Sequence, residues 1–441
     1  MSFLNIKYKG IVLILISFVA YVVLGYFVPR DSFNVLFFLY SLAFVSFCFI
    51  YKSQEFKENQ LFAIGSLFRL VLLFCLPFWS QDFYRFIWDG RLILSGISPY
   101  AFLPNDIIDT VPIAQSKELY DAMGNLSASH YSNYPPINQF FFAIAAFFAS
   151  KSIFFAAFVL KLIVLFADLG IYFFGKKLLL LLNRNPKTIF LYFLNPLVII
   201  ELTGNLHFEG VMLFFLLLGF YFFFLNKWLI SALFITLSIS TKLLPLLLLP
   251  FFYQKLGFKK SVLFYLVIIS FNVLLFLPFV SKDLIANYSE TISLWFVNFE
   301  FNASLYYVFR EIGFYVKGYN TIGIIGKVIP VVSILVILFY SLYKNNLSMT
   351  RVISNGLIAL SIYFFLSTTI HPWYVINLLL LAVFTQYKYP LYWSFFVVLS
   401  YFAYSQESFK ESVILLFIEY LFVFGVFIYE LKFKTIKNNL A

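Results

Sequence analysis

The densest group of chemically capable side chains lies in one short segment, residues 82–91. Asp82, Arg85 and Asp89 stand three and four positions apart there, so a helix would carry them on one face. A carboxylate beside a guanidinium can take a proton from a hydroxyl group while the cation holds an anion. Arg91 closes the segment with a second cation. The segment also fits an interfacial helix with aromatic anchors and local ion pairs.

Further polar residues follow at wide intervals. Tyr134 precedes Pro135 and Pro136, whose fixed φ makes either a rigid lip on a membrane-facing cleft or a simple helix start. His207 and Glu209 stand where one apolar run ends and the next begins. Their spacing without a third ligand is a poor zinc signal, and a carboxylate such as Glu209 is also common at an ordinary helix N-terminus.

Lys242 is a lone lysine in an apolar context, where it could extend to the membrane surface or pair with a phosphate. His371 and Tyr374 belong to a polar and aromatic break between two apolar runs. An imidazole there could donate to a phosphate or a sugar, although a lone histidine is more often structural. Pro196 is expected to kink its helix, and Glu201 to face protein or a wet cleft. Three charged residues inside apolar runs are expected to pair between helices: Arg69, Lys161 and Asp168.

The elements that must position these residues are apolar segments. Hydrophobic residues make up 62% of the 441 positions and charged residues 12%, too few charges to cover a soluble domain. Apolar runs of roughly 20 residues, the length that crosses a bilayer, recur from end to end. The sequence therefore predicts an all-α polytopic membrane protein, a single domain over residues 1–441 with about 12–14 transmembrane helices. Cys48 and Cys75 lie inside apolar runs, so neither a disulfide framework nor a zinc site is expected.

The topology follows from charge. The net charge is +11, and the positive-inside rule assigns the basic loops and both termini to the cytoplasm. Residues 80–152 and 281–320 then form external loops, and the short run 138–150 is re-entrant or interfacial. The candidate residues all lie at external helix ends, whereas a transporter more often places ionisable groups near the midplane. Because topology accounts for the basic charge and no basic patch is interleaved with exposed aromatics, nucleic-acid binding is not expected.

Taken in order, the motifs resemble the polyprenyl-phosphate-sugar-dependent glycosyltransferases of the GT-C fold, above all the bacterial polyprenol-phosphomannose-dependent mannosyltransferases. The resemblance covers residues 60–390, and the joint order of the motifs makes it specific. In related members an acidic residue often follows the histidine of Gly-Asn-x-His directly. Here Phe208 takes that place and the acid comes at Glu209, which leaves the role of Glu209 open. The motifs are Asp-x-Tyr-Arg-x-x-Trp-Asp-Gly-Arg at 82–91, Gly-x-x-Pro-Tyr at 96–100, Tyr-Pro-Pro at 134–136, Asn-Pro-Leu-x-x-x-Glu at 195–201, Gly-Asn-x-His at 204–207, Lys-Leu-x-Pro at 242–245 and His-Pro-Trp-Tyr at 371–374.

The resemblance implies transfer of a sugar, expected to be mannose, from a polyprenyl-phosphate carrier to a glycan or glycolipid acceptor. The reaction would be inverting, on the extracytoplasmic face of a bacterial plasma membrane, with Asp82 as general base. No cofactor and no resident metal are expected, although a divalent cation stays open. The residues expected to bind substrate or phosphate are Arg85, Asp89, Arg91, Tyr134, His207, Glu209, Lys242, His371 and Tyr374.

Two other classes of function remain open. A lipid-linked sugar transporter or flippase should show inverted repeats and broken midplane helices, and neither is clear in the sequence. A polysaccharide polymerase or ligase tends to carry its key residues in a large late external loop. Here the loop that is rich in motifs comes early, and residues 281–320 carry only scattered charges.

Overall fold

The computed structural model describes residues 8–149 and 151–439, and nearly all of them belong to helices. The expected all-α polytopic architecture is confirmed. In the described residues the only strand-like pairing is an isolated bridge between Phe301 and Thr369. In chain order the elements are α1 (Tyr8–Tyr26), α2 (Phe33–Lys52), α3 (Glu58–Leu72), α4 (Asp82–Leu94), α5 (Pro104–Ile107), α6 (Ser116–Ala128), α7 (Pro136–Phe148), α8 (Ile153–Leu181), η2 (Pro186–Ile189), α9 (Phe190–Phe193), α10 (Pro196–Val198), η3 (Ile199–Gly204), α11 (Glu209–Phe224), α12 (Trp228–Ile239), η4 (Leu244–Phe252), α13 (Tyr253–Phe276), η5 (Leu277–Phe279), α14 (Leu284–Val297), α15 (Leu305–Lys317), α16 (Ile322–Tyr343), α17 (Met349–Leu366), η6 (Pro372–Tyr374), α18 (Val375–Val383), α19 (Tyr389–Phe396), η7 (Val397–Ser405) and α20 (Val413–Asn439).

Seven helices of the described chain are long and apolar enough to cross a membrane, and a bent pair would make eight. This is fewer than the expected 12–14 because several apolar runs are short or broken. The pair Pro186–Phe193 and Pro196–Gly204 bends by 52°, as Pro196 predicts, since proline cannot donate to the preceding turn. Asn195 caps the second half by accepting from the Leu197 N–H at 2.9 Å. The helices α11 and α12 are apolar but have only 16 and 12 residues.

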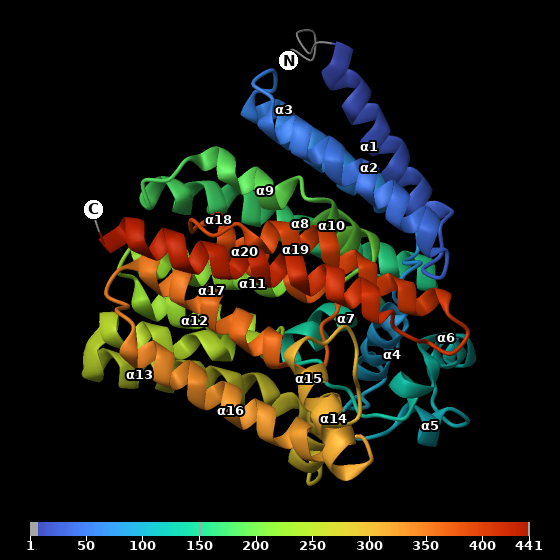
Figure 1. The fold of residues 1–441 in the computed structure, drawn as a ribbon. Helices are drawn as coiled ribbons and strands as arrows, with labels where there is room; N and C mark the ends of the chain where they lie inside the picture. The colour runs from blue at the N-terminus through green and yellow to red at the C-terminus, as the bar shows by residue number, and fades with distance from the viewer. Residues whose placement is uncertain (1–7, 150, 440–441) are drawn as a thin grey trace.

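The helices of the two predicted external loops gather at one end of the bundle. Figure 1 shows α4 to α7 together with α14 and α15 on the right of the view, and the C-terminus on the left. The α4 helix packs on both α6 and α7, and α7 continues into contact with α8. The helices α4 to α7 form the region between α3 and α8, which the sequence predicts to be an external loop.

The contact between α4 and α7 depends on the absence of a side chain. A Cβ on Gly90 would collide with the backbone carbonyl of Phe142. Next to this contact the rings of Phe86 and Phe142 stack with their centroids 4.6 Å apart. Asp89 accepts hydrogen bonds from Ser132 at 2.5 Å and from Gln139 at 3.0 Å. The α4 helix is therefore held against both the start of α7 and the segment before it.

The charged residues inside apolar runs pair between helices, as expected. Arg69 on α3 forms an ion pair of 2.8 Å with Asp168 on α8. Lys161, also on α8, donates to the carbonyls of Leu72 at 2.8 Å and Cys75 at 2.6 Å. All three charged side chains are fully buried, where an unpaired charge would be very costly. They fix α8 against the segment that leads into α4.

The opposite end of the bundle carries basic residues that join distant loops. Lys176, near the end of α8, pairs with Glu58 at the start of α3 at 2.5 Å. Arg184 donates to the carbonyl of Thr385 at 2.9 Å. These basic residues are among those that the positive-inside rule assigns to the cytoplasm. The terminal residues 1–7 and 440–441 lie outside the described residues.

Candidate active site

Segments that are far apart in the sequence meet where α4 begins. Asp82 is the first residue of α4, and Glu209 is the first residue of α11. Lys242 lies between α12 and η4, and His371 directly precedes η6. The charges of Lys242 and Glu209 both act on Asp82, and the charge of Lys242 also acts on His371. Lys242 also contacts Tyr374, whose ring lies against that of His371. These residues therefore lie in one neighbourhood, and their roles stay predictions.

The Asp82 carboxylate is partly exposed and lacks a protein partner. Its backbone N–H donates to the Ser80 hydroxyl at 3.3 Å, but its carboxylate forms no hydrogen bond or ion pair with the residues 8–149 and 151–439. Burial raises the pKa of Asp82 to about 6, with Lys242 and Arg30 opposing the rise and Glu209 adding to it. A carboxylate with a pKa close to neutral pH is suited to general-base chemistry.

Lys242 and Glu209 form an ion pair at the centre of the site. The Glu209 side chain is 2% exposed and that of Lys242 is 36% exposed. The Lys242 ammonium also lies 4.8 Å from the centre of the Tyr374 ring, a cation–π contact. Asn138 of α7 donates to the carbonyl of Thr241 at 2.8 Å, which fixes the backbone next to Lys242. Glu209, whose role the sequence left open, is thus the counter-ion of Lys242.

Two histidines share one indole ring. His207 stacks on Trp373 with ring centroids 3.7 Å apart, and His371 stacks on the same residue at 4.4 Å. Burial and, to a smaller extent, the charge of Lys242 lower the pKa of His371 to about 3. Burial and Lys242 also hold the pKa of His207 well below its usual value. Both imidazoles are therefore neutral at pH 7, and the buried His371 Nδ1 has no partner among the described residues.

A buried carboxylate lies beside His207. Glu201 lies 3.6 Å from His207 Nε2 and accepts from the hydroxyl of Tyr401 at 2.7 Å. Asn205 donates to the same carboxylate at 3.2 Å and accepts from the backbone N–H of Trp79 at 3.3 Å. Glu201 faces protein, as expected, and it links the Gly-Asn-x-His segment to the residues just before α4. Within the part of the chain that the structure describes, no three His, Cys, Asp or Glu side chains are arranged to hold a metal ion.

Arg85, Asp89 and Arg91 contact the surrounding loops. Arg85 and Asp89 form a buried ion pair of 2.7 Å, and Arg85 also donates to the carbonyl of Ser127 at 2.7 Å. Arg91 donates to the carbonyl of Ala114 at 2.5 Å. These contacts hold the loops around α4 in place, and a role of the three residues in binding phosphate stays a prediction.

Two tyrosines that were predicted as site residues, Tyr134 and Tyr374, lie among the residues around Asp82 and Lys242. The Tyr134 ring packs edge-on against Phe86, with centroids 4.9 Å apart. Burial raises the pKa of Tyr134, and the charge of Asp82 raises it further. Tyr374 lies edge-on to His371 at 5.4 Å and carries Lys242 on its face. Their expected contact with substrate stays a prediction.

The second external loop reaches the site through Phe301. The Phe301 N–H donates to the carbonyl of Thr368 at 3.1 Å, and the Phe301 carbonyl accepts from the Ile370 N–H at 2.8 Å. Its ring lies 5.1 Å from the His371 ring. Residues 299–302 therefore form a short strap against the segment that ends at His371.

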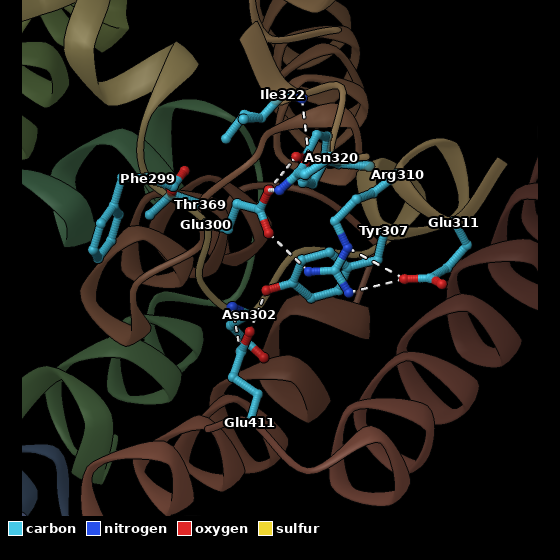
Figure 2. Close-up of polar contacts among 11 residues, drawn as sticks. Phe299, Glu300, Asn302, Tyr307, Arg310, Glu311, Asn320, Ile322, Thr369 and Glu411 are labelled. Carbon is cyan, nitrogen blue, oxygen red and sulfur yellow. Dashed lines mark hydrogen bonds and ion pairs between the residues drawn. The ribbon is translucent and has the colours of Figure 1, made fainter. Parts of the chain in front are cut away.

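Carboxylates on both sides hold this strap, as Figure 2 shows. Glu300 accepts from Arg310 and from Asn320, both at 2.7 Å. Glu411 accepts from the backbone N–H of Asn302 at 2.6 Å, and the Asn302 side chain donates to the buried Glu419 at 3.1 Å. The charges of residues 281–320 look scattered in the sequence. Glu300 and Arg310 are only ten positions apart, but the carboxylates that bind Asn302 lie more than a hundred positions away from it.

A further cation reaches the site from the turn between α1 and α2. The Arg30 guanidinium lies 4.6 Å from the centre of the Tyr404 ring, and its charge acts on Asp82. Neither residue was predicted from the sequence as part of a site. One feature of the sequence could have identified Arg30. The predicted topology places its loop outside the cytoplasm, where the positive-inside rule disfavours an arginine.

Comparison with known proteins identifies the family. Residues 14–256 match the MptA_B family model, described as alpha-(1->6)-mannopyranosyltransferase, N-terminal domain. No curated protein and no solved structure matches the chain. The matched region contains Asp82, Glu209 and Lys242, whereas His371 and Tyr374 lie beyond it. The match covers more than half of the chain and agrees with the resemblance in its motifs. The chain therefore belongs to the MptA_B family of alpha-(1->6)-mannopyranosyltransferases, and it is a membrane-embedded mannosyltransferase.

Proposed function

We propose that this mannosyltransferase takes its mannose from a polyprenyl-phosphate carrier and transfers it, with inversion, to a glycan or glycolipid acceptor. Asp82 acts as the general base. The observation that carries the proposal is Asp82, a partly exposed residue whose carboxylate has no partner among the described residues. The charge of Lys242 acts on both Asp82 and His371. No metal enters the proposed steps.

The proposed reaction is a single displacement at the anomeric carbon. The acceptor oxygen attacks C1 of mannose while Asp82 takes the hydroxyl proton. The bond between C1 and the phosphate oxygen breaks, and its electron pair leaves with the phosphate. The phosphodiester becomes a monoester and gains negative charge, which cationic and hydrogen-bonding groups aimed at it stabilise. The exposed part of Lys242 and the neutral imidazole of His371 are available for this task.

The surroundings of Asp82 support its role. With a pKa of about 6, the carboxylate is mostly ionised at pH 7 and is still basic enough to accept a proton. Its place in the first turn of α4 favours the ionised form, since a helix N-terminus attracts negative charge. One base and one leaving group on opposite sides of C1 give inversion.

The position of the site in the bundle supports a lipid-linked donor. The residues around Asp82 lie at the ends of apolar helices, where the head group of a membrane lipid would also lie. On the positive-inside topology this end faces away from the cytoplasm of a bacterial cell, and both termini face the cytoplasm. A donor that is already in the membrane needs no nucleotide-binding unit.

The test is transfer by purified protein from polyprenyl-phosphate mannose to a mannan oligosaccharide or glycolipid acceptor, with no nucleotide sugar present. We expect transfer by the wild-type chain and a loss of about 100- to 10,000-fold in Asp82→Asn, because a positioned base contributes that much. Asp109→Asn, which alters an exposed carboxylate in the same loop, should keep full activity. Transfer that requires a nucleotide sugar, movement of the lipid across the membrane without transfer, or full activity of Asp82→Asn would each contradict the proposal.

A further inference from the structure

The cations around Asp82 differ in how fully protein groups already engage them. Lys242 is paired with Glu209, and Arg85 is paired with Asp89. Arg91 is directed at the carbonyl of Ala114 and at Gln115. The two histidines are neutral. A phosphate that gains negative charge needs a cation whose N–H groups are free to donate to it. Lys242, Arg85, Arg91 and the two histidines meet this need only in part.

Arg30 has open donors. It lies in the turn between α1 and α2 and is partly exposed. Within residues 8–149 and 151–439 its single hydrogen bond is a long one of 3.5 Å from Nη2 to the side-chain oxygen of Gln81. Among the described residues it forms no ion pair with any carboxylate, and even the adjacent Asp31 is engaged with the Ser32 hydroxyl instead. A guanidinium has five N–H donors, so most of them are available.

Arg30 is nevertheless held in a defined place. The face of Tyr404 lies under its guanidinium at 4.6 Å, a contact that orients the plane of the group. Gln81, its hydrogen-bond partner, directly precedes Asp82. The charge of Arg30 acts on Asp82 and on Tyr401, which contacts Glu201. The cation therefore lies beside the proposed base without being neutralised by it.

We propose that Arg30, supported by Tyr404, binds the phosphate group of the carrier lipid. This inference rests on the proposed function and adds a residue to it. A planar guanidinium can donate two parallel N–H bonds to phosphate oxygens, which a lysine cannot reproduce. Arg30 would hold the donor phosphodiester and then meet the charge gained when the bond to C1 breaks, while the acceptor proton goes to Asp82. The pair also joins the α1–α2 turn to η7, so both ends of the chain complete one site.

Binding of polyprenyl monophosphate, the product without its sugar, tests the proposal separately from transfer. The purified full chain is placed in nanodiscs of neutral lipid, and the affinity for polyprenyl monophosphate is compared with that for the uncharged polyprenol. We expect Arg30→Ala to bind the monophosphate about tenfold to hundredfold more weakly, the loss expected for hydrogen bonds to a charged group. Binding of polyprenol should not change.

Matched variants separate charge, geometry and folding. Arg30→Lys should recover part of the affinity, and Tyr404→Phe should keep it because the ring remains, whereas Tyr404→Ala should lower it. Arg351→Ala, which removes an exposed arginine at the start of α17, should bind as the wild type does. In transfer assays Arg30→Ala should raise the KM for the donor and lower kcat, because the charge on phosphate grows in the transition state.

Several outcomes would overturn the proposal. Unchanged monophosphate affinity in Arg30→Ala would do so, as would an equal loss of monophosphate and polyprenol binding, which indicates a structural role. An effect that is seen only when anionic phospholipid is present, or an equal competition by inorganic phosphate, would assign Arg30 to a different phosphate source. If Arg30→Ala loses monophosphate binding while the wild type transfers no mannose from the lipid donor, the proposed function fails and the binding assignment stands.

Discussion

Replacing Asp82 by Asn should stabilise the protein while abolishing transfer. The raised pKa means that the folded state resists ionisation of this carboxylate, so the charged form destabilises the fold. A rise from 3.8 to about 6 corresponds to about 3 kcal/mol. Because Asp82 is partly exposed, solvent screening reduces this value, and we expect about 1 to 2 kcal/mol. Asn has nearly the shape of a protonated Asp and carries no charge.

The size of this effect depends on pH. Above pH 6 the carboxylate is ionised in both the folded and the unfolded state, so the full destabilisation is present. As the pH falls from 6 to about 4, the folded state takes up the proton first, and the difference between wild type and Asp82→Asn disappears. The assay is thermal unfolding of both proteins in detergent, followed by tryptophan fluorescence at pH 8, 6 and 4. Asp109→Asn is the control and should not shift the midpoint. A lower midpoint for Asp82→Asn at pH 8, or a gain that is the same at pH 4 and pH 8, would refute the reasoning.

Three further predictions concern the elements that support the site. Gly90→Ala should destabilise the protein by about 1–3 kcal/mol or more, because the new methyl group meets the backbone of α7; a normal melting midpoint would argue against this tight contact. Asn302→Ala should cost about 1–3 kcal/mol by leaving Glu419 short of a donor, whereas Arg310→Ala should cost less than about 1 kcal/mol because its ion pairs are partly exposed. The reverse order of these two melting midpoints would contradict the role given to the strap. Lys242→Gln should raise the KM for the lipid donor, and a KM equal to that of the wild type would exclude Lys242 from donor binding.

Much of the site could be predicted because its residues are unusual in their surroundings. Lys242 and His371 each interrupt an apolar sequence, Asp82 opens a segment that is rich in charges, and the positive-inside rule places all three at external helix ends. The pairing of Arg69 with Asp168 could be predicted for the same reason, since neither charge can face lipid.

The remaining details depend on tertiary contacts that leave no local pattern. Arg85 and Asp89 share a helix face with Asp82, yet partners from the segment before α7 make them a separate buried pair. Glu209 has the position of an ordinary helix-start acid, and only the fold brings Lys242 to it. The stacking of His207 and His371 on Trp373 joins segments more than 160 positions apart. Of the described helices, seven have the length and composition of a span and four more apolar helices are shorter, because hydropathy measures how apolar a run is and not where its helix breaks.

The pH dependence of a single turnover tests the central role of Asp82 most directly. With the lipid donor saturating, the rate constant for mannose transfer should fall as the pH drops through about 6, and be about tenfold lower at pH 5 than at pH 7. In Glu209→Gln this limb should move to lower pH, because the lost negative charge no longer raises the pKa of Asp82. A rate that stays constant from pH 7 to pH 5, or a limb that moves to higher pH in Glu209→Gln, would contradict Asp82 as the base.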